Sequence, residues 1–175
     1  KVKVLVTGGL GFIGSHLVDS LVEKGHKVSV IDNLSSISSS RRYQREEVEY
    51  FIEDIRDINC YKFFNKSFDV IYHLAAHARI QPSFFDPLEY ISTNSIGTAN
   101  VCEFARREGS KVVYAGSSSA YGGIMLNPYA FAKETGESIC EMYSSVYDLK
   151  AVTARFFNVY GKRHPVEGKY ATVVG

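Results

Sequence analysis

A glycine-rich turn near the N-terminus constrains the fold of this chain more than any other feature. Gly8, Gly11 and Gly14 form the pattern GxxGxxG in TGGLGFIGSH, between an apolar β-branched run and an amphipathic stretch. Glycines at this spacing permit a tight turn and a close backbone approach, and the start of the following helix presents free N–H groups and a positive dipole end. The sequence therefore predicts a strand, turn and helix unit that binds the pyrophosphate of a dinucleotide.

Short β-branched runs alternate with longer amphipathic stretches along the rest of the chain, as in βαβ units that feed one parallel sheet. Six strands are predicted, at 2–7, 27–31, 48–52, 69–74, 111–115 and 151–156. Helices are predicted at 12–24, where Gly25 provides the C-cap, and at 59–64, 88–107 and 129–147. Right-handed crossovers then give a doubly wound α/β fold, whose ligands lie beyond the carboxyl ends of the strands.

Composition narrows the classes of function. The 175 residues, 45% of them hydrophobic, suit one domain, and 20 basic against 19 acidic residues give no broad field for nucleic acid or an anionic membrane. The odd, widely spaced Cys60, Cys102 and Cys140 argue against a disulfide framework or a metal site and suggest reduced thiols. With no apolar run of membrane-spanning length and no predicted signal peptide, we expect a soluble, cytoplasmic protein.

Asp32 lies at the end of the second predicted strand. Its carboxylate is placed to accept hydrogen bonds from the adenosine ribose hydroxyls and to repel a 2′-phosphate, which favours NAD over NADP. The alternative is a glycine turn that serves only helix packing, with Asp32 as an ordinary turn residue. The segment 35–40, which is rich in serine, is expected to be a mobile, solvated loop rather than a phosphate site.

Tyr129 and Lys133 form YxxxK at the start of a predicted helix, so one helical turn places both on one face. This spacing alone is common by chance, but it follows the fifth strand, whose end carries Ser117, Ser118 and Ser119. A tyrosine, with its reference pKa of about 10, needs a nearby cation to act as a base at neutral pH. Lys133 and an oxidised nicotinamide are expected to supply that charge.

The motifs TGGxGFIGSH, DNLS, HLAA, SSSxYG, PYxxxK and RFFNVYG occur together and in this order. The chain thereby resembles extended short-chain dehydrogenases/reductases of the NAD-dependent epimerase/dehydratase family over nearly its whole length. The resemblance implies an NAD-binding Rossmann domain over residues 1–175, in which 156–175 begins the substrate-binding region. It also implies a small C-terminal substrate domain that is missing or truncated in these residues.

The resemblance assigns roles to individual residues. It implies catalysis by Ser117, Tyr129 and Lys133, and substrate contacts from Ser117, Ser118, Tyr129 and Asn158. The implied cofactor contacts are Gly8, Gly11, Phe12, Ile13, Gly14, Asp32, Asn33, Asp54, Ile55, Leu74, Ala75, Ala76, Tyr129, Lys133 and Phe156. Asp54 and Ile55 also fit an ordinary strand-to-helix turn. Asn94 resembles a structural polar contact behind the cofactor, and His73 and His77 fit packing or loop positions better than acid/base roles.

The residues after Ser117 help to separate the reactions within this family. Dehydratases usually carry an Asp-Glu pair where this chain has Ser118 and Ser119, and decarboxylases usually carry a glutamate at the place of Ser119. Reductases commonly prefer NADP, which Asp32 disfavours. These comparisons favour a UDP-hexose 4-epimerase that acts through a transient 4-keto sugar. The alternatives are a dehydratase, a decarboxylase, a reductase or a non-catalytic NAD-binding protein. A homodimer formed through the helices at 88–107 and 129–147 is also expected.

Overall fold

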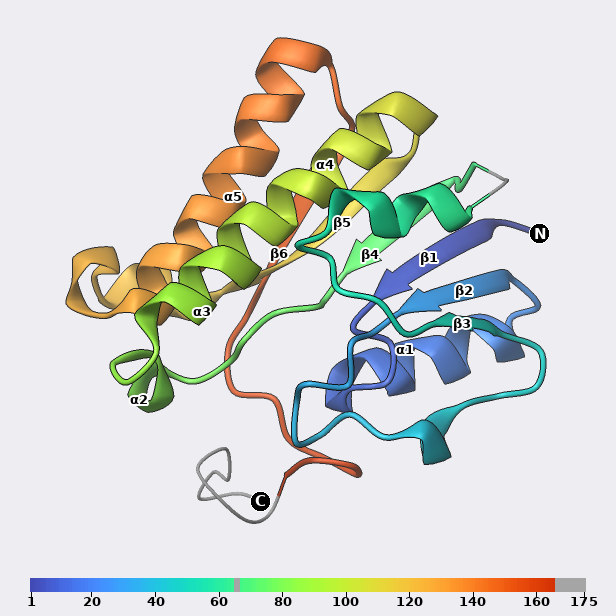
Figure 1. The fold of residues 1–175 in the computed structure, drawn as a ribbon, viewed down its shortest axis with the longest axis horizontal. Coiled ribbons are helices and arrows are strands. Elements are labelled where there is room, and N and C mark those ends of the chain that lie inside the picture. The colour runs from blue at the N-terminus through green and yellow to red at the C-terminus, as the bar shows by residue number, and fades with distance from the viewer. Residues whose placement is uncertain (65–66, 166–175) are drawn as a thin grey trace.

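The computed structural model describes residues 1–64 and 67–165, and within them the chain forms one six-stranded parallel sheet (Figure 1). The strands are β1 (Lys3–Thr7), β2 (Lys27–Ile31), β3 (Glu49–Phe51), β4 (Val70–His73), β5 (Lys111–Ser117) and β6 (Ala151–Phe156). Their order is β3-β2-β1-β4-β5-β6, and every neighbouring pair is parallel. This is the doubly wound order, so the predicted fold class is confirmed.

Helices cover both faces of the sheet. The α-helices are α1 (Phe12–Glu23), α2 (Ile80–Ser83), α3 (Pro87–Ile91), α4 (Gly97–Glu108) and α5 (Pro128–Tyr147). A π-helical turn, η3 (Ser92–Ile96), joins α3 to α4, and the short 3₁₀ helices are η1 (Arg41–Tyr43), η2 (Ile58–Phe63), η4 (Ser118–Gly122) and η5 (Ile124–Leu126). In Figure 1, α1 lies on one face of the sheet, whereas α4 and α5 lie side by side on the other.

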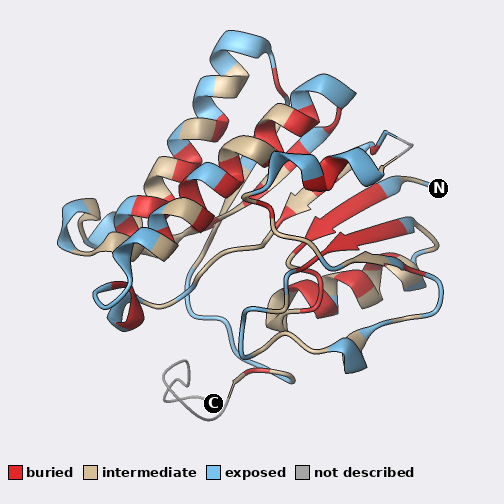
Figure 2. Cartoon of the chain, in the orientation of Figure 1, coloured by how far each residue is buried: buried red, intermediate tan, exposed pale blue. Residues whose placement is uncertain are grey.

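The core is divided by the sheet, because successive strand residues point to opposite faces. Val4 and Val6 of β1 pack with Val18 and Leu21 of α1. Leu5, between them in sequence, instead joins the cluster that α4 and α5 cover. Figure 2 shows the same division, with the buried positions of the helices turned toward the strands. Both faces of β1 are therefore apolar, as expected of a strand inside a parallel sheet.

The helix predicted at 88–107 contains a π-helical turn. The chain is helical without a break from α3 through the η3 π-turn to α4, and the π-turn buries Thr93, Asn94 and Ser95. The four-residue α2 was not predicted, because it is too short to show a helical period and contains Pro82. Elsewhere the strand and helix ends agree with the sequence to within two residues. Gly25 follows α1 with φ +76°, as its predicted role as a C-cap requires.

The glycine turn brings three chain segments into close contact. At Gly8, φ is +74°, and a Cβ there would lie 2.7 Å from the backbone nitrogen of Ala75. At Gly14, a Cβ would overlap the carbonyl oxygen of Gly8. The start of α1 can therefore lie against the ends of β1 and β4 only while these positions lack side chains. No described helix is long and apolar enough to cross a membrane.

This close contact predicts the stability of two matched variants. Gly14→Ala is expected to lower the free energy of unfolding by at least about 2 kcal/mol, because the added methyl group displaces the Gly8 backbone. Gly122→Ala is the control, since nothing lies within 4 Å of the Cβ it would add, and it should stay within about 0.5 kcal/mol of the unaltered chain. Urea denaturation followed by circular dichroism measures both. Equal midpoints for the two variants would contradict the close contact.

Candidate cofactor and substrate site

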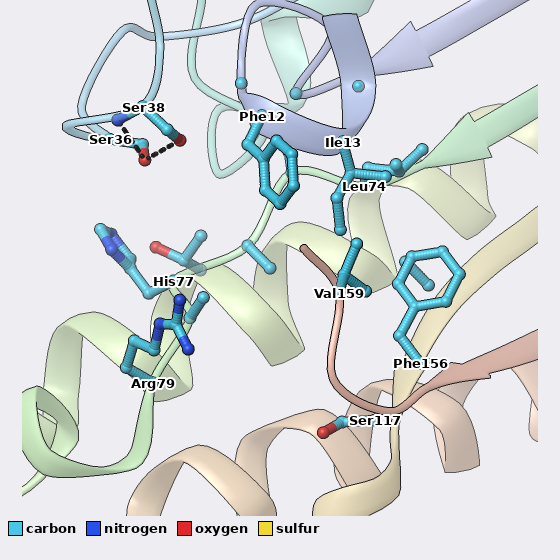
Figure 3. A pocket seen from close by; sticks show the side chains of 18 of the residues that line it. Phe12, Ile13, Ser36, Ser38, Leu74, His77, Arg79, Ser117, Phe156 and Val159 are labelled. Carbon is cyan, nitrogen blue, oxygen red and sulfur yellow. Dashed lines mark hydrogen bonds between the residues drawn. The ribbon is translucent and has the colours of Figure 1, made fainter. Parts of the chain in front are cut away.

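One cavity of about 670 Å³ opens at the carboxyl ends of the strands. Its walls come from the glycine turn, the loops after β2 and β4, the end of β5, the start of α5 and the segment after β6 (Figure 3). β1 and β4 are neighbours here although α1, β2 and β3 separate them in sequence, so this is the point at which the order of the strands reverses. Ligands of doubly wound folds bind at such a point.

The glycine turn fits a dinucleotide. A Cβ on Gly11 would stand 3.4 Å from the Gly8 carbonyl oxygen and 3.8 Å from the hydroxyls of Ser38 and Ser39, so its absence leaves room on the cavity side. Among the described residues, no side chain caps α1, and its first turn contains no acidic residue. The first N–H groups of the helix therefore face the cavity beside Phe12 and Ile13, as an anion requires.

Asp32 is buried at the end of β2 and lines the cavity. One carboxylate oxygen accepts from the backbone N–H of Leu10 (2.9 Å) and the other from that of Leu34 (2.8 Å). The carboxylate therefore braces the glycine turn as well as facing the cavity. Each oxygen keeps further acceptor capacity for a ribose hydroxyl. The alternative of an ordinary surface turn residue does not fit this burial.

Asp54 does not lie in the cavity wall, whereas its neighbour Ile55 does. The Asp54 carboxylate accepts from the guanidinium of Arg56 (2.6 Å) and from the side-chain amide of Asn33 (3.1 Å). The hydrogen bonds from Arg56 hold the pKa of Asp54 down, at about 2, against a smaller raising effect of burial. The Asp54 carboxylate thus supports Asn33, which does line the cavity, and its own contact with a cofactor stays a prediction.

The loop after β4 forms the floor of the cavity. Leu74, Ala75 and Ala76 line it as predicted. Asn94, from the π-turn, clamps the next residue: its amide oxygen accepts from the backbone N–H of His77 (2.8 Å) and its amide nitrogen donates to the His77 carbonyl (2.9 Å). Asn94 is thus a structural contact behind the cavity, as the sequence suggested.

The two histidines of this loop have different environments. His73 is fully buried, with Nδ1 2.7 Å from Thr7 Oγ1 and Nε2 2.9 Å from Thr98 Oγ1. Burial lowers its pKa to about 3, so His73 is a neutral packing residue that joins β1 to α4. His77 lies in the loop, as expected, but its side chain also lines the cavity and pairs with Glu89 (3.1 Å).

Ser117 and Tyr129 meet at the floor of the cavity. Ser117 ends β5, two residues beyond the predicted end of that strand. Tyr129 lies in the first turn of α5, where Asn127 caps the helix and Pro128 fits the N1 position. The Tyr129 hydroxyl donates to Ser117 Oγ (3.2 Å), which also accepts from Ser119 Oγ (2.8 Å). Ser118 and Ser119 line the same wall.

Lys133 is buried one turn after Tyr129. Its ammonium donates to the carbonyl of Ala115 and lies 4.4 Å from the centre of the Tyr114 ring. Burial lowers its pKa to about 8. Burial likewise raises the pKa of Tyr129, while the Ser117 hydrogen bond and the positive charge of Arg79 lower it. The Lys133 ammonium therefore contacts the end of β5, while the positive charge of Arg79 lowers the pKa of Tyr129. An action of Lys133 on the pKa of Tyr129 stays a prediction.

The segment after β6 closes one side of the cavity. Phe156 and Asn158 line it as predicted, together with Phe157, Val159 and His164. His164 packs edge-on against Phe12 of α1, with ring centres 5.0 Å apart. The predicted substrate-binding region at 156–175 thus reaches the cavity in its described part, and residues 166–175 lie outside the described residues.

Two parts of the cavity wall were not predicted. Residues 35–39 form a loop that is largely exposed, as expected, but they also line the cavity, and Ser36 and Ser38 share a hydrogen bond there (2.9 Å; Figure 3). Their position directly after Asp32 and Asn33 was the available signal, because a segment that leaves a strand at its carboxyl end starts at the ligand edge. Arg79 also lines the cavity, and no sequence motif marked it.

The chain belongs to the NAD dependent epimerase/dehydratase family, whose model matches residues 4–174. It is 32% identical to a putative UDP-glucose 4-epimerase of Methanocaldococcus jannaschii, over 97% of this chain and 60% of that protein. It is 32% identical to a UDP-N-acetyl-alpha-D-glucosaminuronate decarboxylase of Bacillus cytotoxicus, over 99% of this chain and 59% of the other. UDP-glucuronate 4-epimerase 6 of Arabidopsis thaliana is 35% identical, over 91% of this chain and 40% of that protein.

Solved structures agree with this membership. A UDP-glucose 4-epimerase from Thermotoga maritima, solved with UDP-glucose, superposes with a TM-score of 0.90 at 32% identity, over 98% of this chain and 60% of that chain. A Thermus thermophilus UDP-glucose 4-epimerase solved with NAD superposes with a TM-score of 0.84 at 32% identity, over 96% of this chain and 59% of that chain. The family resemblance, the Rossmann fold and NAD as the family's cofactor are thereby confirmed. The chain spans about 60% of the length of these proteins.

The position of Asp32 predicts cofactor preference. The protein is expected to bind NAD at least tenfold more tightly than NADP, a gap of about 1.4 kcal/mol. Asp32→Asn should narrow the gap, because it removes the charge that repels a 2′-phosphate but keeps one oxygen acceptor for the glycine turn. Asp32→Ala should narrow it as well and also weaken both cofactors, since the Leu10 and Leu34 N–H groups lose their acceptor. Fluorescence titration measures each affinity, and equal affinities in the unaltered protein would contradict the assignment.

Proposed function

We propose that this chain is the cofactor-binding part of an NAD-dependent nucleotide-sugar epimerase of the UDP-hexose 4-epimerase type. The observation that carries the proposal is the hydrogen bond from Tyr129 to Ser117 in the wall of a cavity whose opposite side is the glycine turn. A phenol that is hydrogen-bonded to a serine beside a buried lysine has the parts needed to take a proton from a sugar hydroxyl.

The chain's own residues would act on the sugar as follows. Tyr129, as phenolate, removes the proton of the sugar 4-hydroxyl, and Ser117 positions that hydroxyl and relays the proton. Bound NAD supplies the acceptor and later the donor of the C4 hydride. Lys133 holds the end of β5 through Ala115 and reaches the same wall of the cavity. The 4-keto sugar then turns over and is reduced on its other face, with Tyr129 returning the proton.

The side chains beside Ser117 favour epimerisation over elimination of water. Ser118 and Ser119 stand where a dehydratase needs its own acid and base, and Ser119 is engaged with Ser117. Among the described residues that line the cavity, the carboxylates are Asp32 and Glu53, which follow β2 and β3 rather than β5. A decarboxylase is the second candidate, because the Bacillus cytotoxicus relative is one. The hydroxyl of Ser119, where decarboxylases usually carry glutamate, speaks against it.

A non-catalytic NAD-binding protein on the same fold is the alternative from another class. Tyr129, Ser117 and Lys133 are all present and share one cavity, which supports turnover. The substrate that we propose is a UDP-hexose, since relatives named as epimerases include UDP-glucose and UDP-glucuronate enzymes. A cytoplasmic location stays a prediction.

We also propose a homodimer through α4 and α5, which lie side by side on one face of the sheet (Figure 1). Phe104 of α4 belongs to the core, where its ring is stacked on Tyr61 at 4.6 Å. Val146 is 63% exposed on α5, with Met142 and Tyr147 beside it. An apolar helix face of this kind is suited to packing against its own copy.

Replacing the proposed base predicts a split between binding and turnover. In the protein as its gene encodes it, Tyr129→Phe should leave NAD binding nearly intact but cut epimerase turnover by roughly two to four orders of magnitude. Ser117→Ala should lower turnover less than Tyr129→Phe does, and Lys133→Met should impair both turnover and NAD binding. Turnover should rise with pH through the pKa of Tyr129, because only the phenolate accepts the proton. A coupled assay over UDP-glucose, UDP-N-acetylglucosamine and UDP-glucuronate measures these effects.

Tyr147→Phe is the matched control, since it makes the same chemical change at the far end of the same helix. Near-normal turnover of Tyr129→Phe would rule out the mechanism and make His77 the next base to test. An unaltered protein that binds NAD but turns over no nucleotide sugar would favour the non-catalytic alternative.

The proposed dimer predicts that a charge introduced on α5 lowers the molar mass of the protein in solution. The unaltered protein should scatter light as a dimer at tens of micromolar, whereas Val146→Glu should shift it toward monomer, because the new charge would be buried between the helices. Lys24→Glu is the control, as Lys24 is exposed directly after α1, on the opposite face of the sheet from α4 and α5. A monomer in the unaltered protein would contradict the proposed interface.

A further inference from the structure

Arg79 has a backbone conformation that arginine rarely adopts. Its φ is +83° and its ψ is 139°, at the position that precedes α2. A non-glycine residue at this φ destabilises the fold, whereas glycine adopts it without strain. Backbone conformations of this kind concentrate at functional sites. The neighbouring positive-φ positions of the cavity wall include Gly8, where a glycine meets the same demand.

Neighbouring contacts hold this conformation in place. His77 is clamped by Asn94 through both its N–H and its carbonyl group. The carbonyl of Ala78 accepts from the Tyr90 hydroxyl (2.7 Å). Arg79 follows directly and is itself followed by the first residue of α2. The backbone on both sides is thus fixed, and the Arg79 side chain has a defined place from which to act.

The side chain points into the cavity beside His77 (Figure 3). Its Nη2 atom lies 3.2 Å from His164 Nε2, which must accept because a guanidinium only donates. Within the described part of the chain, no carboxylate forms an ion pair with Arg79. A guanidinium that faces a ligand cavity with a neutral partner still has its charge and most of its donors to offer an oxyanion.

The position of Arg79 relative to Tyr129 indicates which part of a sugar it faces. Tyr90, which holds Ala78, packs edge-on against Tyr129 with ring centres 6.3 Å apart. The positive charge of Arg79 also lowers the pKa of Tyr129, although the larger effect of burial raises it. In a hexose whose C4 hydroxyl is at Tyr129, the nearest substituents are the C3 hydroxyl and C6, which is bonded to C5. Of these two, only C6 can be a carboxylate. The C1 diphosphate leaves from the opposite side of the ring.

We propose that Arg79 is a specificity residue that binds the C6 carboxylate of a nucleotide hexuronate, so that the preferred substrate is a nucleotide-linked uronic acid. The assignment rests on the proposed function and deepens it. A carboxylate presents two oxygens to the planar fork of a guanidinium, whereas the C6 hydroxyl of a neutral hexose presents one.

The test compares UDP-glucuronate with UDP-glucose on the protein as its gene encodes it. Arg79→Met is expected to lower the ratio of kcat/KM for UDP-glucuronate over UDP-glucose at least tenfold, mainly through KM. Arg79→Lys, which keeps the charge but loses the fork, should recover part of the ratio. Arg42→Met is the control, because it removes an exposed arginine on η1 that does not line the cavity, and it should leave the ratio unchanged.

Calorimetric titration of the NAD-loaded protein with both UDP-sugars separates the possible failures. If Arg79→Met lowers the affinity for both UDP-sugars equally, Arg79 binds the diphosphate that they share, and the proposal is overturned. A tenfold loss of affinity for NAD would overturn it too. A ratio that does not move would overturn it as well. If the unaltered protein binds neither UDP-sugar, the proposed function itself fails, whereas binding of both with no effect of Arg79→Met removes only this inference.

A stability measurement completes the test. Arg79→Gly removes the side chain and the unfavourable φ together, so it should raise Tm by about 2 °C while it lowers the substrate ratio as far as Arg79→Met does. A rise in Tm with a lowered ratio supports an arginine retained for its ligand. A fall in Tm without a change in the ratio would show a purely structural role and overturn the proposal.

Discussion

The contact between the glycine turn and the end of β4 is the constraint on which the rest of the site depends. Gly8 approaches the Ala75 backbone, and Gly14 approaches the Gly8 carbonyl, more closely than any side chain would allow. This approach sets the start of α1 at the point where the order of the strands reverses, and it leaves the N–H groups of the helix facing the cavity. Asp32 then secures the turn from β2 by accepting from Leu10. One carboxylate thus holds the shape of the turn and also lines the cavity.

A second set of buried polar contacts fixes the substrate side. His73 joins Thr7 to Thr98, and Asn94 holds His77 from the π-turn. A π-turn adds a residue to the helical path, and here it turns Asn94 toward the loop after β4 while Ile96 stays exposed. On the other side of the cavity, Glu137 of α5 pairs with Arg155 of β6 (2.8 Å) behind Gly116. The ends of β4, β5 and β6 are therefore held by buried, paired groups and not by apolar packing alone.

The sequence predicted the parts of the molecule that are specified locally. Strands and long helices follow from hydrophobic period, and the glycine turn, Asp32 and the Tyr129 and Lys133 pair follow from motifs placed after strands. The contacts that no motif indicates concern the surroundings of single side chains and an unusual backbone. The Asp54 carboxylate accepts from Arg56 and Asn33, and the Lys133 ammonium donates to Ala115. Nothing in the letters HAR indicates that Arg79 has a positive φ, because arginine is not a residue that this conformation selects.

The contrast between locally specified elements and individual side chains on loops explains why the family of this chain is clear while its reaction has to be argued residue by residue. The contacts that build the cavity belong to the glycine turn, the strand ends and buried pairs such as that of Glu137 and Arg155, and relatives with different names can share them. In our proposal the reaction depends on a few side chains of the cavity wall, at Ser118, Ser119 and Arg79, each on a loop or a short 3₁₀ helix. Exchanging such a side chain leaves the core packing in place, so the chemistry can change while the fold stays the same. Function in this family therefore has to be argued from those loops, where Ser119 meets Ser117 and Arg79 faces the cavity beside His77.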